Sequence, residues 1–177
     1  MDIKDTAALQ IDRPAPLDTP EDTATWKRLL VPLDGSPVAE TILPIAARMA
    51  RGLSLEILLL RAVRDDPPRV VEAGRHIVID QTAQRTREAE EYLQGVADRL
   101  SAAGLRVRTT VRAGDAAREI LAGAREGEAD LIAMSTHGRG ALGRLIHGSV
   151  TEAVLHRTDL PVFVVRAAES DNRTQAA

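Results

Sequence analysis

Short apolar runs and helical stripes of apolar residues alternate along the chain from residue 27 onward. A run of about four to eight aliphatic residues is typical of a buried strand, whereas apolar residues spaced by three or four positions predict an amphipathic helix. The run at 105–112 alternates apolar with charged residues, which favours an edge or half-exposed strand. The predicted strands lie at 28–32, 55–60, 105–112, 131–134 and 160–165.

Helix start and stop signals separate these strands. Ser36 is the expected N-cap of a first helix, with Pro37 in the first helical position, and Gly114-Asp115 is the expected opener of a later helix. A longer connection, which contains two prolines and a glycine, follows the second strand. The apolar stripes run from Ile42 to a stop at Gly52, from Ala89 to a stop at Gly104, from Ile120 to a stop at Gly127, and from Val150 to Leu155.

Strands that alternate with helices in this way predict an α/β fold. The right-handed crossovers that such units require give a parallel sheet with helices on both faces. We expect a doubly wound, Rossmann-like five-stranded sheet with its strands in the order 3-2-1-4-5. In that order the topological switch lies between the first and fourth strands, where ligands bind at the carboxyl ends. The loops 32–36 and 135–140 would meet there.

The two ends of the chain differ from this core. Residues 1–25 contain six acidic and two basic residues together with Pro14, Pro16 and Pro20, which interrupt any helix. We expect a flexible acidic tail there, either an unimportant extension or a docking segment for a partner. The predicted domain covers residues 26–167, and a short C-terminal tail covers residues 168–177.

Composition excludes several classes of function. The 177-residue chain has a formal net charge of −3 and no cysteine, which excludes disulfides, thiolate metal sites and a cysteine nucleophile. Its aromatic residues are Trp26, Tyr92 and Phe163, too few for a platform that stacks nucleic-acid bases. No apolar run approaches the ~20 residues of a membrane span, and the N-terminus has no signal-peptide pattern. We therefore expect a cytoplasmic protein without nucleic-acid or membrane partners.

A glycine-rich segment follows the fourth predicted strand. Gly138-Arg139-Gly140-Ala141-Leu142-Gly143 matches G-x-G-x-x-G, but a dinucleotide site requires this motif after the first strand. A Walker A loop is not indicated either, because no lysine precedes Ser149. Gly148-Ser149 opens the last helix, where free N–H groups favour a phosphate. Alternatively, Ser149 is only an N-cap and the glycines only shape the loop.

Other catalytic arrangements find little support. A triad of Asp34, His137 and Ser36 lacks the strained nucleophile turn of hydrolases, and Ser36 already has a capping role. The four histidines show no spacing typical of a metal site. A divalent ion would instead arrive with a nucleotide, as magnesium does. With no catalytic base evident, we expect no enzyme, or at most slow ATP hydrolysis.

Four segments together resemble the universal stress protein (UspA-type) family. They are LLVPLDGS at 29–36, MSTHG at 134–138, GSV at 148–150 and LPVFVV at 160–165, and the resemblance extends from Lys27 to Arg166. The ATP-binding branch of that family has a glycine, two residues, a second glycine, nine residues, and then glycine followed by serine or threonine. Gly138, Gly148 and Ser149 match this signature, but Ser135 stands at the first glycine position.

The resemblance implies an ATP site, with magnesium, in the adenine-nucleotide α-hydrolase-like form of the fold. Asp34 would hold the ribose or a metal-bound water, and Ala62 would offer backbone groups to adenine. The glycine-rich segment would wrap the phosphates, and the start of the last helix would close over them. The expected nucleotide-binding residues are Pro32, Leu33, Asp34, Ala62, Met134, Ser135, His137, Gly138, Arg139, Gly140, Gly148, Ser149 and Val150.

The last predicted strand points to a partner. An apolar edge strand from Leu160 to Val165 would template aggregation if it were bare, so we expect it to be paired or covered. Pairing with the same strand of a second copy would give a homodimer, and the resemblance implies a homodimer as well. The alternative is that residues 167–177 cover this edge. The expected function is a nucleotide-dependent stress-response regulator. The alternative, favoured by Ser135, is a dimeric interaction module that binds a client protein and no nucleotide.

Overall fold

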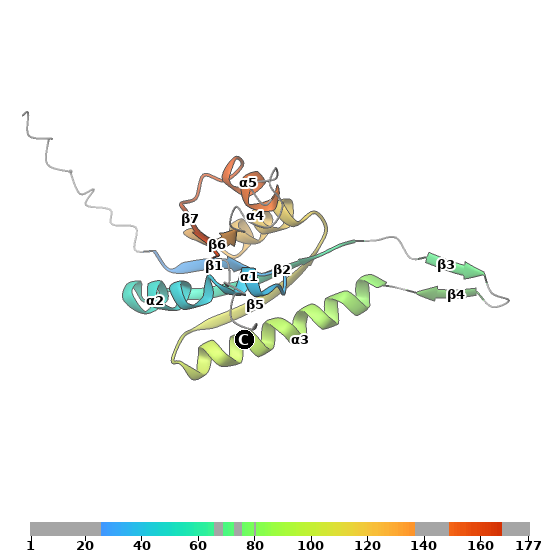
Figure 1. Cartoon of the computed structure of the whole chain (residues 1–177), viewed down its shortest axis with the longest axis horizontal. Coiled ribbons are helices and arrows are strands. Elements are labelled where there is room, and N and C mark those ends of the chain that lie inside the picture. The colour runs from blue at the N-terminus through green and yellow to red at the C-terminus, as the bar shows by residue number, and fades with distance from the viewer. Residues whose placement is uncertain (1–25, 66–68, 73–75, 80, 137–148, 168–177) are drawn as a thin grey trace, which may run out of the picture.

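The computed structural model describes residues 26–65, 69–72, 76–79, 81–136 and 149–167. Five strands form one parallel sheet in the order β5-β2-β1-β6-β7 (Figure 1). This is the predicted 3-2-1-4-5 order of a doubly wound fold, which is therefore confirmed. The strands are β1 (Arg28–Pro32), β2 (Glu56–Val63), β5 (Val107–Ala113), β6 (Leu131–Thr136) and β7 (Val162–Arg166).

Helices cover both faces of this sheet (Figure 1). Because successive side chains of a strand point to opposite faces, β1 contributes to two hydrophobic cores. Leu29 packs in the core beneath α2 and α3, whereas Leu30 packs in the core beneath α4 and α5, and both side chains are fully buried. The helices are α1 (Pro37–Glu40), α2 (Leu43–Leu53), α3 (Gln81–Ala102), α4 (Ala116–Glu126) and α5 (Ser149–Leu155).

The predicted helix starts are confirmed. Ser36 Oγ accepts a hydrogen bond from the backbone N–H of Ala39 at 3.1 Å, and Pro37 is the first residue of α1. Asp115 caps α4 in the same way, through the N–H of Arg118 at 3.0 Å. Both caps lie directly after a strand of the sheet, so each fixes where a helix leaves the carboxyl edge.

The first predicted helix differs from the structure in two respects. It is divided into α1 and α2, because Pro44 has no N–H for the carbonyl of Glu40 and is accommodated only in the first turn of a new helix. The predicted stop at Gly52 is also wrong. The helix continues to Leu53 and ends at Ser54, which takes the left-handed conformation at φ 56°.

The connection after β2 contains structure that the sequence analysis missed. Strands β3 (Arg69–Glu72) and β4 (His76–Ile79) form an antiparallel hairpin that lies away from the five-stranded sheet (Figure 1). Each strand is only four residues long and lies among proline and glycine signals, which predict a loop. The hairpin contributes no strand to the central sheet.

The two edges of the sheet are β5 and β7. The edge position of β5 confirms the interpretation of its alternating pattern. Among the described residues, no helix has the length and apolar character needed to cross a lipid bilayer. The predicted tails, 1–25 and 168–177, lie outside the described residues and stay predictions.

Candidate functional site

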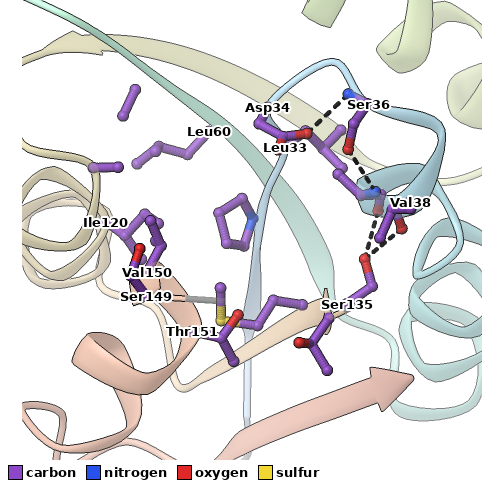
Figure 2. Close-up of a pocket in the computed structure, with 16 residues that line it drawn as sticks. Leu33, Asp34, Ser36, Val38, Leu60, Ile120, Ser135, Ser149, Val150 and Thr151 are labelled. Carbon is purple, nitrogen blue, oxygen red and sulfur yellow. Dashed lines mark hydrogen bonds between the residues drawn. The ribbon is translucent and has the colours of Figure 1, made fainter. Parts of the chain in front are cut away.

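A cavity of about 220 Å³ opens at the carboxyl ends of β1 and β6, the neighbouring strands at the topological switch (Figure 2). Its walls come from the β1–α1 turn, α1, β2, β6 and the first turns of α4 and α5. The lining residues are Pro32, Leu33, Asp34, Ser36, Val38, Ala39, Leu60, Ala62, Ala116, Ile120, Met134, Ser135, Thr136, Ser149, Val150 and Thr151.

The structure brings together every expected nucleotide-binding residue that it describes. The eight that line the cavity are Pro32, Leu33, Asp34, Ala62, Met134, Ser135, Ser149 and Val150. The five others, His137, Gly138, Arg139, Gly140 and Gly148, lie outside the described residues. Loop residues separated by more than a hundred positions in the sequence thus meet at one end of the sheet, as parallel strands require.

The β1–α1 turn is fixed by local hydrogen bonds. Asp34 Oδ1 accepts from the N–H of Ser36 at 2.8 Å, and the buried Leu33 donates its N–H to the carbonyl of Leu60 at 2.8 Å. Gly35 takes φ +85°, a conformation that other residues rarely adopt, and a side chain there would meet the guanidinium of Arg61 at 3.2 Å. The turn therefore presents the exposed Asp34 at the mouth of the cavity.

Side chains of α3 hold the outer side of α1. Tyr92 donates its hydroxyl to Glu40 at 3.0 Å, and Arg99 reaches the other oxygen of the same carboxylate at 2.9 Å. Arg61 lies over the Tyr92 ring, 5.0 Å from its centroid. Burial, followed by the hydrogen bond to Glu40, raises the pKa of the Tyr92 hydroxyl above its ordinary value of 10.0. Tyr92 is therefore a neutral donor at physiological pH.

Ser135, which replaces the first glycine of the nucleotide-binding signature, uses its side chain within the protein. Its hydroxyl donates to the carbonyl of Val38 at 2.6 Å and lies 3.2 Å from the carbonyl of Ala39. Figure 2 shows the Ser135 side chain turned toward Val38. The extra atoms relative to glycine are thus directed at α1.

The cavity combines two kinds of surface. Leu60, Ile120, Met134 and Val150 supply apolar contacts, whereas Asp34 supplies a carboxylate. The remaining polar groups are hydroxyls of serine and threonine. Such a lining suits a ligand with one flat apolar part and one polyhydroxylated part. Among the residues that the structure describes, no group of three histidine or acidic side chains is positioned to hold a metal ion.

Several lining residues were not expected from the sequence. Ala116 and Ile120 belong to α4, four positions apart, and therefore lie on one face of its first turns. The helix opener Gly114-Asp115 could have predicted these two residues, because it places the start of α4 at the carboxyl edge of the sheet. The other residues missed are Val38, Ala39, Leu60 and Thr151, while Ser36 and Thr136 lie in the two loops that were expected to meet there but were not among the expected nucleotide-binding residues.

Comparison with known proteins gives consistent results. Universal stress protein MJ0531 of Methanocaldococcus jannaschii is 29% identical over 149 residues, which cover 82% of this chain and 85% of the relative. A universal stress protein structure in complex with cAMP shares 21% identity at a TM-score of 0.60 and covers 81% of this chain and 99% of its own. A universal stress protein from Archaeoglobus fulgidus in complex with dAMP shares 21% identity at a TM-score of 0.57, covering 79% and 98%.

Identities at this level show that the fold is shared with the solved structures. The family itself is established by sequence: the model of the universal stress protein family matches residues 25–166, which include every strand of the central sheet. The chain belongs to the universal stress protein family.

Proposed function

We propose that this protein binds ATP, together with magnesium, in the cavity between β1 and β6 and acts as a homodimeric, nucleotide-dependent stress-response regulator. The observation that carries the proposal is the cavity itself. It lies at the topological switch and gathers eight residues that the resemblance to the family implies for a nucleotide. Structures of the same fold bound to cAMP and dAMP support an adenine nucleotide as the ligand class.

The lining suggests how the nucleotide would lie. The apolar wall of Leu60, Ile120 and Met134 suits the adenine ring, with Ala62 offering backbone groups at its edge. Asp34 accepts hydrogen bonds, as a ribose hydroxyl requires. Ser149 begins α5, and its hydroxyl and the nearby N–H groups face the region that the phosphates would occupy. Gly138, Arg139, Gly140 and Gly148 are proposed to complete the phosphate contacts.

The donor set fits magnesium that arrives with the nucleotide. Mg²⁺ is commonly held by one or two carboxylates, phosphate oxygens and water. Asp34 is the acidic residue in the described lining, and its Oδ1 accepts a hydrogen bond from the N–H of Ser36. Bound magnesium would neutralise phosphate charge. Asp34 would orient a water of its hydration shell, and the described lining offers no further carboxylate or histidine as a general base.

We also propose that β7 pairs with its copy in a second protomer. Phe163 and Val164 of this edge strand are 44% and 36% exposed, and they point to opposite faces of the sheet. An exposed apolar edge is stabilised by pairing with another strand. A two-fold axis beside β7 would place the same residues opposite one another in both protomers.

Thermal unfolding of the nucleotide-stripped protein tests the proposed ligand. Mg-ATP at 100 times its Kd should stabilise the fold by about 2.7 kcal/mol, which raises Tm by roughly 5 to 11 °C for a chain of this size. GTP and NAD serve as controls and should give much smaller shifts. An unchanged Tm at millimolar Mg-ATP would contradict the proposal and favour the interaction-module alternative.

A further inference from the structure

The helix α1 forms one wall of the cavity but is only four residues long. Ser36, Val38 and Ala39 line the cavity from this segment. Such a short helix cannot pair its own last carbonyls, since a helix leaves its final C=O groups without internal partners. The position of this wall therefore depends on donors from the residue that caps α1 and from neighbouring elements.

The carbonyl of Val38 receives donors of two kinds. Thr41, the C-cap of α1, donates to it through its N–H at 3.2 Å and through its hydroxyl at 2.7 Å. Both of these bonds are local. The third donor is the hydroxyl of Ser135 at 2.6 Å, which comes from β6, 97 positions away in the sequence. This bond joins α1 to the neighbouring wall of the cavity, which β6 forms.

We infer that Ser135 is a positioning residue for the nucleotide: its hydroxyl ties α1 to the neighbouring strand β6 and so fixes the shape of the cavity wall that these two elements form together. The inference rests on the proposed function, since it assigns a role within the same site. A glycine at position 135 has no donor for Val38. The serine therefore adds a hydrogen bond to the site, and its hydroxyl is turned toward α1 (Figure 2).

The test compares Mg-ATP affinity by titration calorimetry of the full chain for four proteins, at a temperature where circular dichroism shows all of them folded. Ser135→Ala removes the tie. Thr41→Ala is a matched control because it removes a hydroxyl from the same carbonyl, lies on the exposed side of α1 and leaves β6 untouched. Ser135→Thr keeps a hydroxyl at the position. The wild-type protein completes the set.

We expect Ser135→Ala to weaken Mg-ATP binding by roughly three- to tenfold, the size of one net hydrogen bond, and Ser135→Thr to restore most of that loss. Thr41→Ala should leave the affinity within about twofold of wild type, since its bond stays within α1 and its C-cap and does not reach β6. A purely structural effect of Ser135 would lower Tm and leave the affinity of the folded protein unchanged.

Three results would overturn the inference: equal affinity of Ser135→Ala and wild type, an equal loss in Thr41→Ala, or no recovery in Ser135→Thr. Absence of binding by the wild-type protein is a different failure, because it rejects the proposed function before the variants are compared.

Discussion

The two edge strands of the sheet, β5 and β7, differ in how far helices and side chains cover them. The β5 half is enclosed by the 22-residue α3 on one face and the 11-residue α4 on the other, and its valines, Val107 and Val111, are half-buried. The β7 half is packed by the seven-residue α5, and its strand exposes Phe163 and Val164. Both edges have unpaired backbone groups among the described residues, yet only β7 offers an apolar surface beside them. The contrast supports pairing at β7 and solvent at β5.

Ion pairs connect the edge strand β5 to α4. Arg112 donates Nε to Glu119 at 2.9 Å and forms a two-bond contact with Glu126 at 2.8 and 3.1 Å. These bonds raise the pKa of the Arg112 guanidinium, with Glu126 contributing most. Glu119 is 9% exposed, so its carboxylate requires this partner. The network ties the edge strand to α4, whose first turns line the nucleotide cavity.

The largest expected effect follows from a charge at the apolar edge. Val164→Lys places one lysine from each protomer in the proposed interface, and a cost of about 1.4 kcal/mol for each would weaken the dimer roughly a hundredfold. Sedimentation equilibrium measures the change. Thr109→Lys on β5 is the control and should leave the association constant unchanged. Equal weakening by both variants would show that β7 is not the interface.

An intermediate effect is expected at the β5 edge. Arg112→Met should lower the free energy of unfolding by about 1–3 kcal/mol, because the nearly buried Glu119 would keep only the exposed Arg118, at 3.4 Å, as a charged partner. Arg108→Met removes an exposed ion pair with Glu56 at 3.0 Å and should cost no more than about 1 kcal/mol. Urea unfolding measures both. Similar losses of unfolding free energy in the two variants would mean that the burial of Glu119 does not strengthen its ion pair with Arg112.

The smallest effect concerns pH, and it tests the enclosure by α3. A raised Tyr92 pKa means that the unfolded chain loses this proton first, so stability is complete below pH 10.0 and falls as pH rises above it. Tyr92→Phe should remove this part of the alkaline decline and cost about 1 kcal/mol at neutral pH, through the lost bond to Glu40. Unfolding curves between pH 8 and 11 measure it. An identical alkaline slope in both proteins would contradict the assignment.

Local signals predicted most of the elements. Apolar runs found all five strands of the sheet, and Ser36 and Asp115 marked two helix starts because a cap involves only residues within one turn. The errors also have local causes. Pro44 was not weighed as a break in the first helix, and the four-residue strands β3 and β4 were too short to be distinguished from a loop.

The sequence predicted those residues of the candidate site that lie at the carboxyl ends of the parallel strands. Asp34, Ser135 and Ser149 were expected to meet because parallel strands bring their carboxyl ends to one edge, and the structure places all three around the cavity. Ala116 and Ile120 were missed, because only the packing of α4 over Leu60 brings its first turns to the same space. The residues at 137–148, which the signature also implicates, lie outside the described part of the chain.

The sequence by itself determined the strands, the capped helix starts and the family to which the motifs point. These depend on periodicity and on contacts between residues close in the chain. Only the tertiary structure decided that Ser135 bonds to Val38 and that Tyr92 reaches Glu40, pairs separated by 97 and 52 positions. The physical reason is that a hydrogen bond requires its two atoms within about 3 Å, and no local pattern specifies which distant segments approach that closely.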